Sequence, residues 1–412
     1  PELYHQASRV LLHQWDVERA LIEDYRLDPK TIDYKDKQAM LRRVAYFMQA
    51  TEKGLAGNLI RGKDLEGILT EYLRTIDVNQ ARLVARVLIR QLRERNFILC
   101  YLGADYYGFV HRTFLEYFCA WEFIWQFKET QRLSLEELKT EVFGKHWRDE
   151  SWHEVLRLIV GMIEESRFAG EIIEYLMNQE GEDEKFMNVF LAAQCLEEVK
   201  NRREIEATDK RLMDCLKKLQ DYVKIEYSYR RNIISWEVSG KAVTAIAITW
   251  KQDPDTLPLL KQLIQSDDNG GVQRAAIREL ARGWKDDPDT LPLLKQLMQS
   301  DDNGFVRGAA IEELARGWKQ DPDTLPLLKQ LIQSNDDEFV RGAAIEELAR
   351  GWKQDPDTLP LLKQLIQSND DEFVRSAAIE ELAKGWKDDP DTLPLLKQLI
   401  QSNDDEFVRS AA

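Results

Sequence analysis

Residues 318–351 read WKQDPDTLPLLKQLIQSNDDEFVRGAAIEELARG, and nearly the same 34 residues recur before and after them. Trp and Pro therefore return at a fixed interval along the second half of the chain. The recurring residues are Trp250, Trp284, Trp318, Trp352 and Trp386, together with Pro254, Pro288, Pro322, Pro356 and Pro390. A fixed period of this length predicts a solenoid, in which each unit packs on its neighbours.

Each unit contains two stretches of apolar residues at helical spacing. They are Leu325, Leu328, Leu331 and Ile332 in the first stretch and Val340, Ala344 and Leu348 in the second. Pro322 and Pro326 fall where the first helix starts, which is where Pro is tolerated, and the polar residues 335–337 separate the two helices. Gly351 is expected to stop the second helix. Because neither short helix can bury its apolar face alone, we expect the units to stack.

Two classes of repeat have lengths close to this period. Tetratricopeptide repeats place Trp, Gly and Tyr early in their first helix and Pro at the end, and this unit lacks that arrangement. The short helices, the Asp-rich turn and the Val-Arg pair at 340–341 resemble HEAT repeats instead. A row of Trp would also suit a ligand platform, but Trp is highly buried on average, which favours core packing.

The repeats extend past their full units at both ends. Residues 238–250, VSGKAVTAIAITW, align with residues 306–318, so a degenerate second helix is expected before the full units begin at about residue 250. At the other end the chain stops inside a second helix, and the apolar face left there is expected to self-associate. The chain starts at Pro1 with no signal peptide, and we interpret it as a piece of a longer protein.

The chain is acidic, with a formal net charge of -16, and each of the three units between residues 284 and 385 carries -3. Such a surface repels a phosphate backbone, so no DNA binding is expected. The candidates for a concave, partner-binding surface are Arg341, Glu346, Glu347 and Arg350. Glu346 and Arg350 also stand at i, i+4, and a solvated face is the favoured interpretation. Units 318–351 and 352–385 differ at only two positions, so a binding role and recent duplication cannot be separated.

The beginning of the chain has a different pattern, in which helices precede a hairpin. Helices are predicted at 3–25, 36–50, 64–74 and 78–94, with Asp64 as the N-cap of the third. Residues 96–111, NFILCYLGADYYGFVH, then alternate like a β-hairpin around residues 103–105. Three helices followed by a hairpin predict a winged helix.

Residues 109–120, FVHRTFLEYFCA, resemble the winged-helix segment of bacterial NACHT proteins, an NLR-like branch of the STAND signalling ATPases. Residues 2–20 are similar to the helix that follows the nucleotide-binding and first helical domains of that family, and residues 151–162 to its next helical region. The expected order is a linking helix at 1–28, a winged helix at 29–127, a helical HEAT-like domain at 128–230 and a HEAT-repeat solenoid at 231–412. The expected fold class is therefore mainly α.

The resemblance implies a role for one residue, His111. In NACHT proteins the His of the FxHxxF segment contacts the β-phosphate of ADP and holds the closed, inactive state, and His111 matches that His. An imidazole N–H can donate to a phosphate oxygen, although a structural histidine at a strand-to-helix junction is the alternative interpretation.

The resemblance also implies a wider function. ADP or ATP with Mg²⁺ would bind in the full-length parent, through an upstream nucleotide-binding domain, and the array would recognise a protein trigger. Release of the ADP-bound state would then let the cytoplasmic protein signal, in a setting such as bacterial antiviral defence. A passive HEAT scaffold with no nucleotide switch is the alternative function. Two further functions are less well supported by the sequence. An enzyme with a HEAT fold would need a pocket lined by reactive residues, which the sequence does not indicate. A winged helix that binds DNA would bind through electrostatic attraction to the phosphates.

No catalytic residue and no metal site is expected on this chain. Residues 57–64 match the spacing of a phosphate-binding loop, but Asp64 replaces its Ser or Thr, and the stretch is expected to join two helices. Residues 265–270 resemble a calcium loop, but Gln265 and Ala276 replace two ligands. Hydrolase motifs and apolar runs long enough to cross a membrane are both missing from the sequence. The cysteines form no CxxC pair and are expected to be reduced core residues. They are Cys100, Cys119, Cys195 and Cys215.

Overall fold

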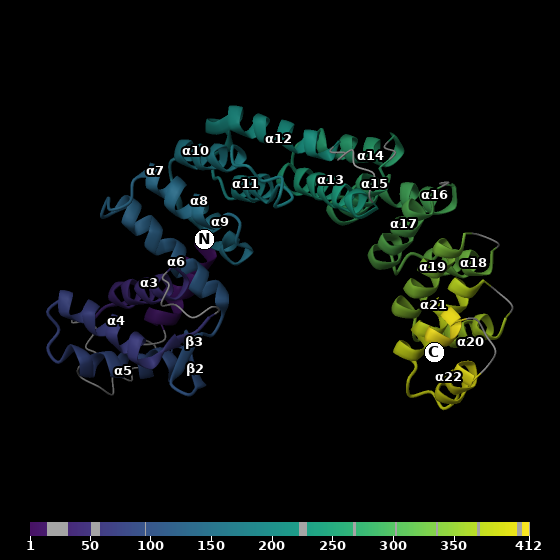
Figure 1. Ribbon diagram of the computed structural model, residues 1–412, viewed down its shortest axis with the longest axis horizontal. Helices are drawn as coiled ribbons and strands as arrows, with labels where there is room; N and C mark the ends of the chain where they lie inside the picture. The colour runs from purple at the N-terminus through teal and green to yellow at the C-terminus, as the bar shows by residue number, and fades with distance from the viewer. Residues whose placement is uncertain are drawn as a thin grey trace. The chain divides into compact units, whose positions relative to one another are not determined.

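The computed structural model describes residues 1–14, 32–50, 58–94, 96–221, 229–266, 269–300, 303–334, 337–368, 371–401 and 406–411. The chain divides into two compact units, Pro1–Leu212 and Met213–Ala412 (Figure 1). Helices dominate both units, which confirms the predicted mainly α fold class. The domain boundaries predicted at residues 28, 127 and 230 stay predictions, and residue 28 lies outside the described residues.

The helices predicted for the first unit are present with changed bounds. They are α1 (Glu2–Arg9), which continues as the π-helical turn η1 (Val10–Gln14), α3 (Tyr34–Ala50), α4 (Gly62–Thr75) and α5 (Ala81–Glu94). The part of the predicted helix 3–25 that follows residue 14 lies outside the described residues. α5 begins three residues later than predicted because Asp77 and Gln80 both take a φ of 56°, which a right-handed helix excludes.

Asp64 does not cap α4, and that prediction is wrong. The N–H of Gly62 donates to the carbonyl oxygen of Asp105 at 2.7 Å, and the helix begins at Gly62. Arg61 takes the N-cap position without a side-chain hydrogen bond. Asp64 lies in the first turn instead, where its carboxylate interacts favourably with the positive end of the helix.

One antiparallel sheet of three short strands completes the winged helix. The predicted hairpin is confirmed as β2 (Leu99–Gly103) and β3 (Tyr106–Phe109), joined at Ala104 and Asp105 with φ angles of 47° and 62°. β1 (Ile60–Arg61) pairs with the other edge of β3, so the strand order is β1-β3-β2. The sequence did not predict β1, although the described part of residues 57–64 leads into α4 as expected.

α6 (Arg112–Lys128) follows the hairpin and contacts both α3 and α9. The elements after it are α7 (Leu135–Glu137), η3 (Leu138–Phe143), α8 (Gly144–His146), η4 (Glu150–Trp152), α9 (His153–Met162), α10 (Ser166–Met177), α11 (Met187–Glu197), η5 (Arg202–Ile205) and α12 (Glu206–Gln220). α6 buries side chains around most of its circumference, as expected for a helix in the middle of a unit.

The second unit contains the predicted helix pairs. α13 (Tyr229–Thr249) includes the degenerate second helix, and five pairs follow it. The pairs are α14 (Thr256–Ser266) with α15 (Gly270–Gly283), α16 (Thr290–Ser300) with α17 (Gly304–Gly317), α18 (Thr324–Gln333) with α19 (Glu338–Gly351), α20 (Thr358–Gln367) with α21 (Glu372–Gly385), and α22 (Thr392–Gln401) with α23 (Glu406–Ala411). α19 ends at Gly351, as expected, although Gly351 does not take a left-handed conformation. Trp352 is the C-cap, and its N–H donates to the carbonyl of Leu348 at 2.9 Å.

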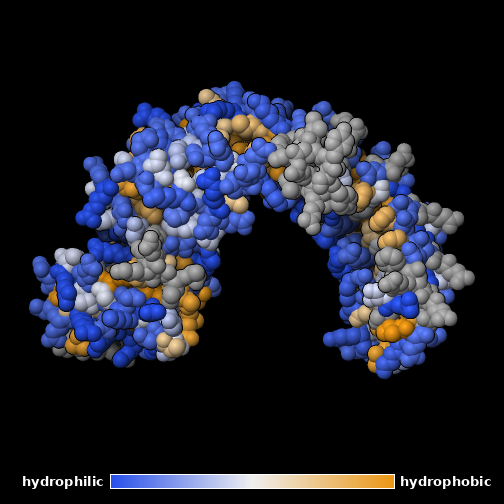
Figure 2. All heavy atoms as spheres, viewed as in Figure 1, coloured by the Kyte–Doolittle hydropathy of each residue, from blue (hydrophilic) through white to orange (hydrophobic). Residues whose placement is uncertain are grey.

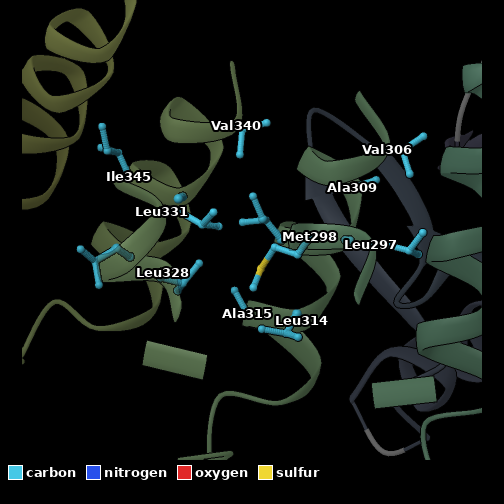
Figure 3. Close-up of a cluster of buried hydrophobic side chains, with 14 of the residues drawn as sticks. Leu297, Met298, Val306, Ala309, Leu314, Ala315, Leu328, Leu331, Val340 and Ile345 are labelled. Carbon is cyan, nitrogen blue, oxygen red and sulfur yellow. The ribbon is translucent and has the colours of Figure 1, made fainter. Parts of the chain in front are cut away.

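The second helices form one layer of the array and the first helices form another (Figure 1). Each second helix from α13 to α21 contacts the next, and each first helix from α14 to α22 contacts the second helix of its own pair. In Figure 3, Leu328 and Leu331 of α18 face Met298 of the preceding unit. Trp284, Trp318, Trp352 and Trp386 pack half-buried against this continuous core and Trp250 is buried, which agrees with the interpretation of the Trp row as packing.

A lysine on each first helix from α14 to α20 ties its unit to the next one. Lys295 donates to Asp321 at 2.9 Å and to Asp323 at 2.8 Å, and both carboxylates lie in the turn before α18. Lys261, Lys329 and Lys363 make the same forked contact with the unit that follows them. Such exposed or half-exposed pairs contribute about 0.2–1 kcal/mol each, so their effect comes from repetition.

These lysine forks predict that the array loses stability in acid. The hydrogen bond from Lys295 holds the pKa of Asp321 below its ordinary value of 3.8, and the bond from Lys329 does the same for Asp355. A carboxylate with a lowered folded pKa contributes stability above its unfolded pKa, and that contribution is lost as the pH falls through the folded value. We expect the melting temperature of the second unit to fall below about pH 4, and to fall less in the variant Lys295→Met/Lys329→Met. Equal pH slopes for the two proteins, measured by calorimetry at several pH values, would contradict this prediction.

Candidate functional site

His111 lies where β3 passes into α6. Its backbone is extended, with φ -123° and ψ 129°, and it takes the N-cap position of the helix. Its carbonyl accepts a hydrogen bond from the N–H of Phe114 at 3.0 Å, while its imidazole is exposed and 6.5 Å from the Phe114 ring. The imidazole makes no capping hydrogen bond to α6. The side chain can therefore receive a partner from outside the winged helix.

The backbone on both sides of His111 is held firmly. The side-chain oxygen of Asn58 accepts the N–H of Phe109 at 2.9 Å, and the Asn58 amide donates back to the Phe109 carbonyl. The N–H of Val110 donates to the carbonyl of Ile98 at 2.9 Å. Phe109 itself is buried and packs on Phe118 of α6, with 6.1 Å between the ring centroids. These contacts hold the backbone at the start of α6, while the His111 side chain itself is exposed.

The start of α6 is electrostatically suited to an anion. No acidic residue lies in its first turn, and the N-terminal end of a helix carries partial positive charge. Arg112 follows His111 and donates from Nε to Glu116 at 2.8 Å and from Nη2 to the carbonyl of Ser151 at 3.3 Å. Burial raises the pKa of Glu116 even though Arg112 opposes the shift. The exposed imidazole of His111 thus lies at the N-terminal end of α6, while the Arg112 guanidinium is held by Glu116 and Ser151.

The four charged residues predicted for the array surface divide into two kinds. Arg341 is buried, contrary to the prediction that it faces a partner, and its Nε donates to the carbonyl of Ile332 at the end of α18, at 3.0 Å. A helix end needs such donors because its last carbonyls have no partner within the helix. Glu347 is also buried, which raises the pKa of its carboxyl group.

Glu346 and Arg350 are exposed and form the predicted i, i+4 ion pair. Arg350 also donates to Glu347 at 2.6 Å, so its guanidinium joins an exposed carboxylate to a buried one. A partner-binding role for this pair stays a prediction. In Figure 2 the visible face of the repeats is mostly hydrophilic, with small apolar patches between charged residues.

The sequence analysis did not single out the Phe residues of the array. Phe305, Phe339 and Phe373 are each more than two fifths exposed, and each directly precedes a fully buried Val on its second helix. The signal for this was present in the sequence. Neighbouring positions on a helix point in directions about 100° apart, so a Phe next to a core Val cannot share its burial.

The phosphate-loop-like stretch 57–64 and the calcium-loop-like stretch 265–270, which the sequence analysis rejected as sites, are only partly described by the structure. Gly57 of the loop-like stretch 57–64 and residues 267–268 of the calcium-like loop lie outside the described residues. Asn269 caps α15, since its side-chain oxygen accepts the N–H of Gly271 at 3.0 Å. Among the residues that the structure describes, no group of His, Cys, Asp and Glu is placed to hold a metal ion. All four cysteines are free thiols, and burial raises the pKa of Cys119 and Cys195.

Within the same described residues, no helix combines the length and apolar character needed to cross a membrane.

Comparison with known families gives a match for each unit. Residues 1–123 match the family model described as a winged helix-turn-helix domain C-terminal to NACHT. HEAT repeats match four overlapping stretches, residues 234–315, 269–349, 306–383 and 325–412. No curated protein matches the chain.

Proposed function

The chain is a NACHT-associated winged helix followed by HEAT repeats, and from this combination we propose that it is the regulatory and sensor portion of a NACHT-type STAND signalling ATPase. The nucleotide-binding domain lies upstream of Pro1 in this proposal, so ADP, ATP and Mg²⁺ belong to the longer protein. The winged helix holds the ADP-bound off state, and the array recognises a protein trigger. Bacterial antiviral defence is the setting that we propose for this switch.

The observation that carries the nucleotide part of the proposal is the exposed imidazole of His111 at the start of α6. A phosphate oxygen placed there would accept a hydrogen bond from the ring and would face the positive end of a helix. The contacts of Asn58 and Phe109 hold the backbone in place, so contact with the phosphate requires little rearrangement. When the contact between His111 and the phosphate is lost, the packing of the winged helix on the upstream domain changes in consequence.

The array supports the sensor part of the proposal because its units are joined in two ways. A continuous apolar core runs through the second helices, and the lysine forks tie successive units together. A partner that binds one conformation of the array better than another shifts the equilibrium between the two conformations. Coupling to nucleotide then requires that the nucleotide also favours one of these conformations over the other. A passive HEAT scaffold would use the same surface without any coupling to nucleotide.

The replacement His111→Ala tests this proposal in the full-length protein. We expect the variant to release bound ADP about tenfold faster, because it lacks a charge-assisted hydrogen bond to the β-phosphate worth about 1.5–3 kcal/mol. The measurement is the ADP that copurifies and its release rate in the presence of excess ATP. His111→Gln, which keeps an N–H donor, should retain more ADP than His111→Ala.

Arg90→Ala is the matched control, since Arg90 is an exposed residue of α5 in the same winged helix. It should retain ADP as the unchanged protein does. If His111→Ala and Arg90→Ala retain equal amounts, the nucleotide switch is refuted and the passive scaffold becomes the better explanation.

A further inference from the structure

Three Phe side chains form an exposed aromatic row on the array, which we call the Phe ladder. Phe305 of α17, Phe339 of α19 and Phe373 of α21 are 65%, 57% and 45% exposed. The ring centroids of Phe305 and Phe339 are 6.3 Å apart, and those of Phe339 and Phe373 are 5.8 Å apart. Rings at these distances touch their neighbours, so the row is continuous across three units.

The Phe ladder contributes little to the fold of its own helices. The Val residue after each Phe is fully buried in the array core, and the Phe side chains point away from that core. Each helix is started by another side chain, such as Asp337, whose carboxylate accepts the N–H groups of Phe339 and Val340. Exposed aromatic residues in a contiguous patch are typical of protein interaction sites.

Small residues lie beside the Phe ladder on the same helical face. Gly308 stands three residues after Phe305, and a Cβ atom at Gly308 would lie 3.9 Å from the Cβ of Ala343 in the next unit. Gly342 has the same relation to Ala377, at 4.0 Å. Neighbouring second helices therefore approach closely there, and no large side chain from these positions competes with a partner for the Phe rings.

The charges around the Phe ladder are mainly acidic. Asp337 and Glu338 directly precede Phe339, and the next unit repeats this arrangement before Phe373, whereas Asn303 and Gly304 precede Phe305. Further along the helix the exposed Glu346 is paired with Arg350, so the pair adds little net charge. Over the whole unit, residues 318–351, the net charge is -3 with Arg341 and Arg350 included. A partner for this face must therefore bring positive charge.

The spacing of the rings restricts the partner further. In an α-helix, residues four apart are separated by about 6.0 Å along the axis, close to the spacing of the Phe ladder. We propose that the Phe ladder and its acidic flanks bind a basic amphipathic helix, whose apolar residues at i, i+4 and i+8 pack on Phe305, Phe339 and Phe373. This inference rests on the proposed recognition role of the array and names the chemistry of the partner.

The test uses the 412-residue chain and a fluorescent synthetic peptide of about 18 residues, with Leu at i, i+4 and i+8 and Lys beside them. A second peptide keeps the Leu residues and replaces every Lys with Glu. We expect saturable binding of the Lys peptide by fluorescence anisotropy, and about tenfold weaker binding or none for the Glu peptide. The variant Phe305→Ala/Phe339→Ala/Phe373→Ala should weaken binding of the Lys peptide by at least about tenfold.

Two further variants separate the aromatic and charged contributions. Ile400→Ala removes an exposed apolar side chain from α22, a first helix, and should leave binding unchanged. Glu338→Gln/Glu372→Gln keeps the Asp caps and should weaken binding and reduce its dependence on salt. Circular dichroism melts of each variant establish that the array is folded, which is expected because the replaced Phe side chains are exposed.

Three outcomes would overturn the inference. The first is equal binding of the Lys and Glu peptides, and the second is unchanged binding by the triple Phe variant. The third is concentration-dependent dimerisation of the chain, seen by sedimentation, that the triple Phe variant abolishes, because the Phe ladder would then join two copies. None of these outcomes affects ADP retention through His111, so the inference can fail while the proposed nucleotide switch stands.

Discussion

Replacing Glu122 with Leu will destabilise the first unit by about 3–5 kcal/mol, the cost of leaving a buried charge without its partner. Arg42 of α3 and Glu122 of α6 are both buried, with 3.8 Å between Nε and the carboxylate oxygen. The Arg42 guanidinium also lies over the rings of Trp121 and Trp125, at 5.1 and 4.8 Å from their centroids. Burial lowers the pKa of Arg42, yet an arginine stays protonated at neutral pH.

The double replacement Arg42→Met/Glu122→Leu should recover much of that loss, because it removes both charges and leaves apolar groups of similar volume. Hydrogen exchange of α3 and α6, followed by mass spectrometry, measures the stability of this region alone. Glu141→Leu is the matched control, since Glu141 forms an exposed i, i+4 pair with Lys145 and should cost less than about 1 kcal/mol. A double variant as unstable as Glu122→Leu would show that the charge pair is not the cause.

Replacing Leu348 with Ala will destabilise the array by about 2–5 kcal/mol around the substituted unit. Leu348 of α19 is fully buried in the core that joins the second helices, and its loss leaves a cavity between rigidly packed neighbours. Each unit contacts mainly the units on either side, so the loss of exchange protection should centre on α17, α19 and α21. Protection of α3 and α6 in the first unit should not change.

Leu393→Ala provides the comparison for that measurement. Leu393 is 57% exposed on α22, so the same chemical change should cost no more than about 0.5 kcal/mol. The hydrogen-exchange protection of α19 should be lower in Leu348→Ala than in Leu393→Ala. Equal protection in the two variants would show that the second helices do not form the stabilising layer of the array.

Local patterns predicted a large part of this molecule. The 34-residue period, the two helices in each unit and the hairpin near residue 104 all depend on residues close together in sequence. Helical and strand spacing are properties of such short stretches, so they can be recognised before the fold is known. The FxHxxF segment likewise placed His111 at a strand-to-helix junction, and the structure has it there, while its nucleotide role stays a proposal.

Other features depend on residues that are far apart in the chain. Ile60 and Arg61 are too few to show a strand pattern, and they form β1 because β3 offers an unpaired edge. Arg341 carries a charge that suggests the surface, but the end of α18 supplies a carbonyl that needs a donor.

The same holds for exposure. The period repeats the Phe339–Val340 pair at 305–306 and 373–374, and the packing of neighbouring helices buries each Val and leaves each Phe at the surface. The sequence therefore establishes the repeat, its helices and the hairpin, because these follow from local spacing. Which side chains are buried, paired or open to a partner follows from the packing of distant segments, because burial depends on what lies opposite each residue in space.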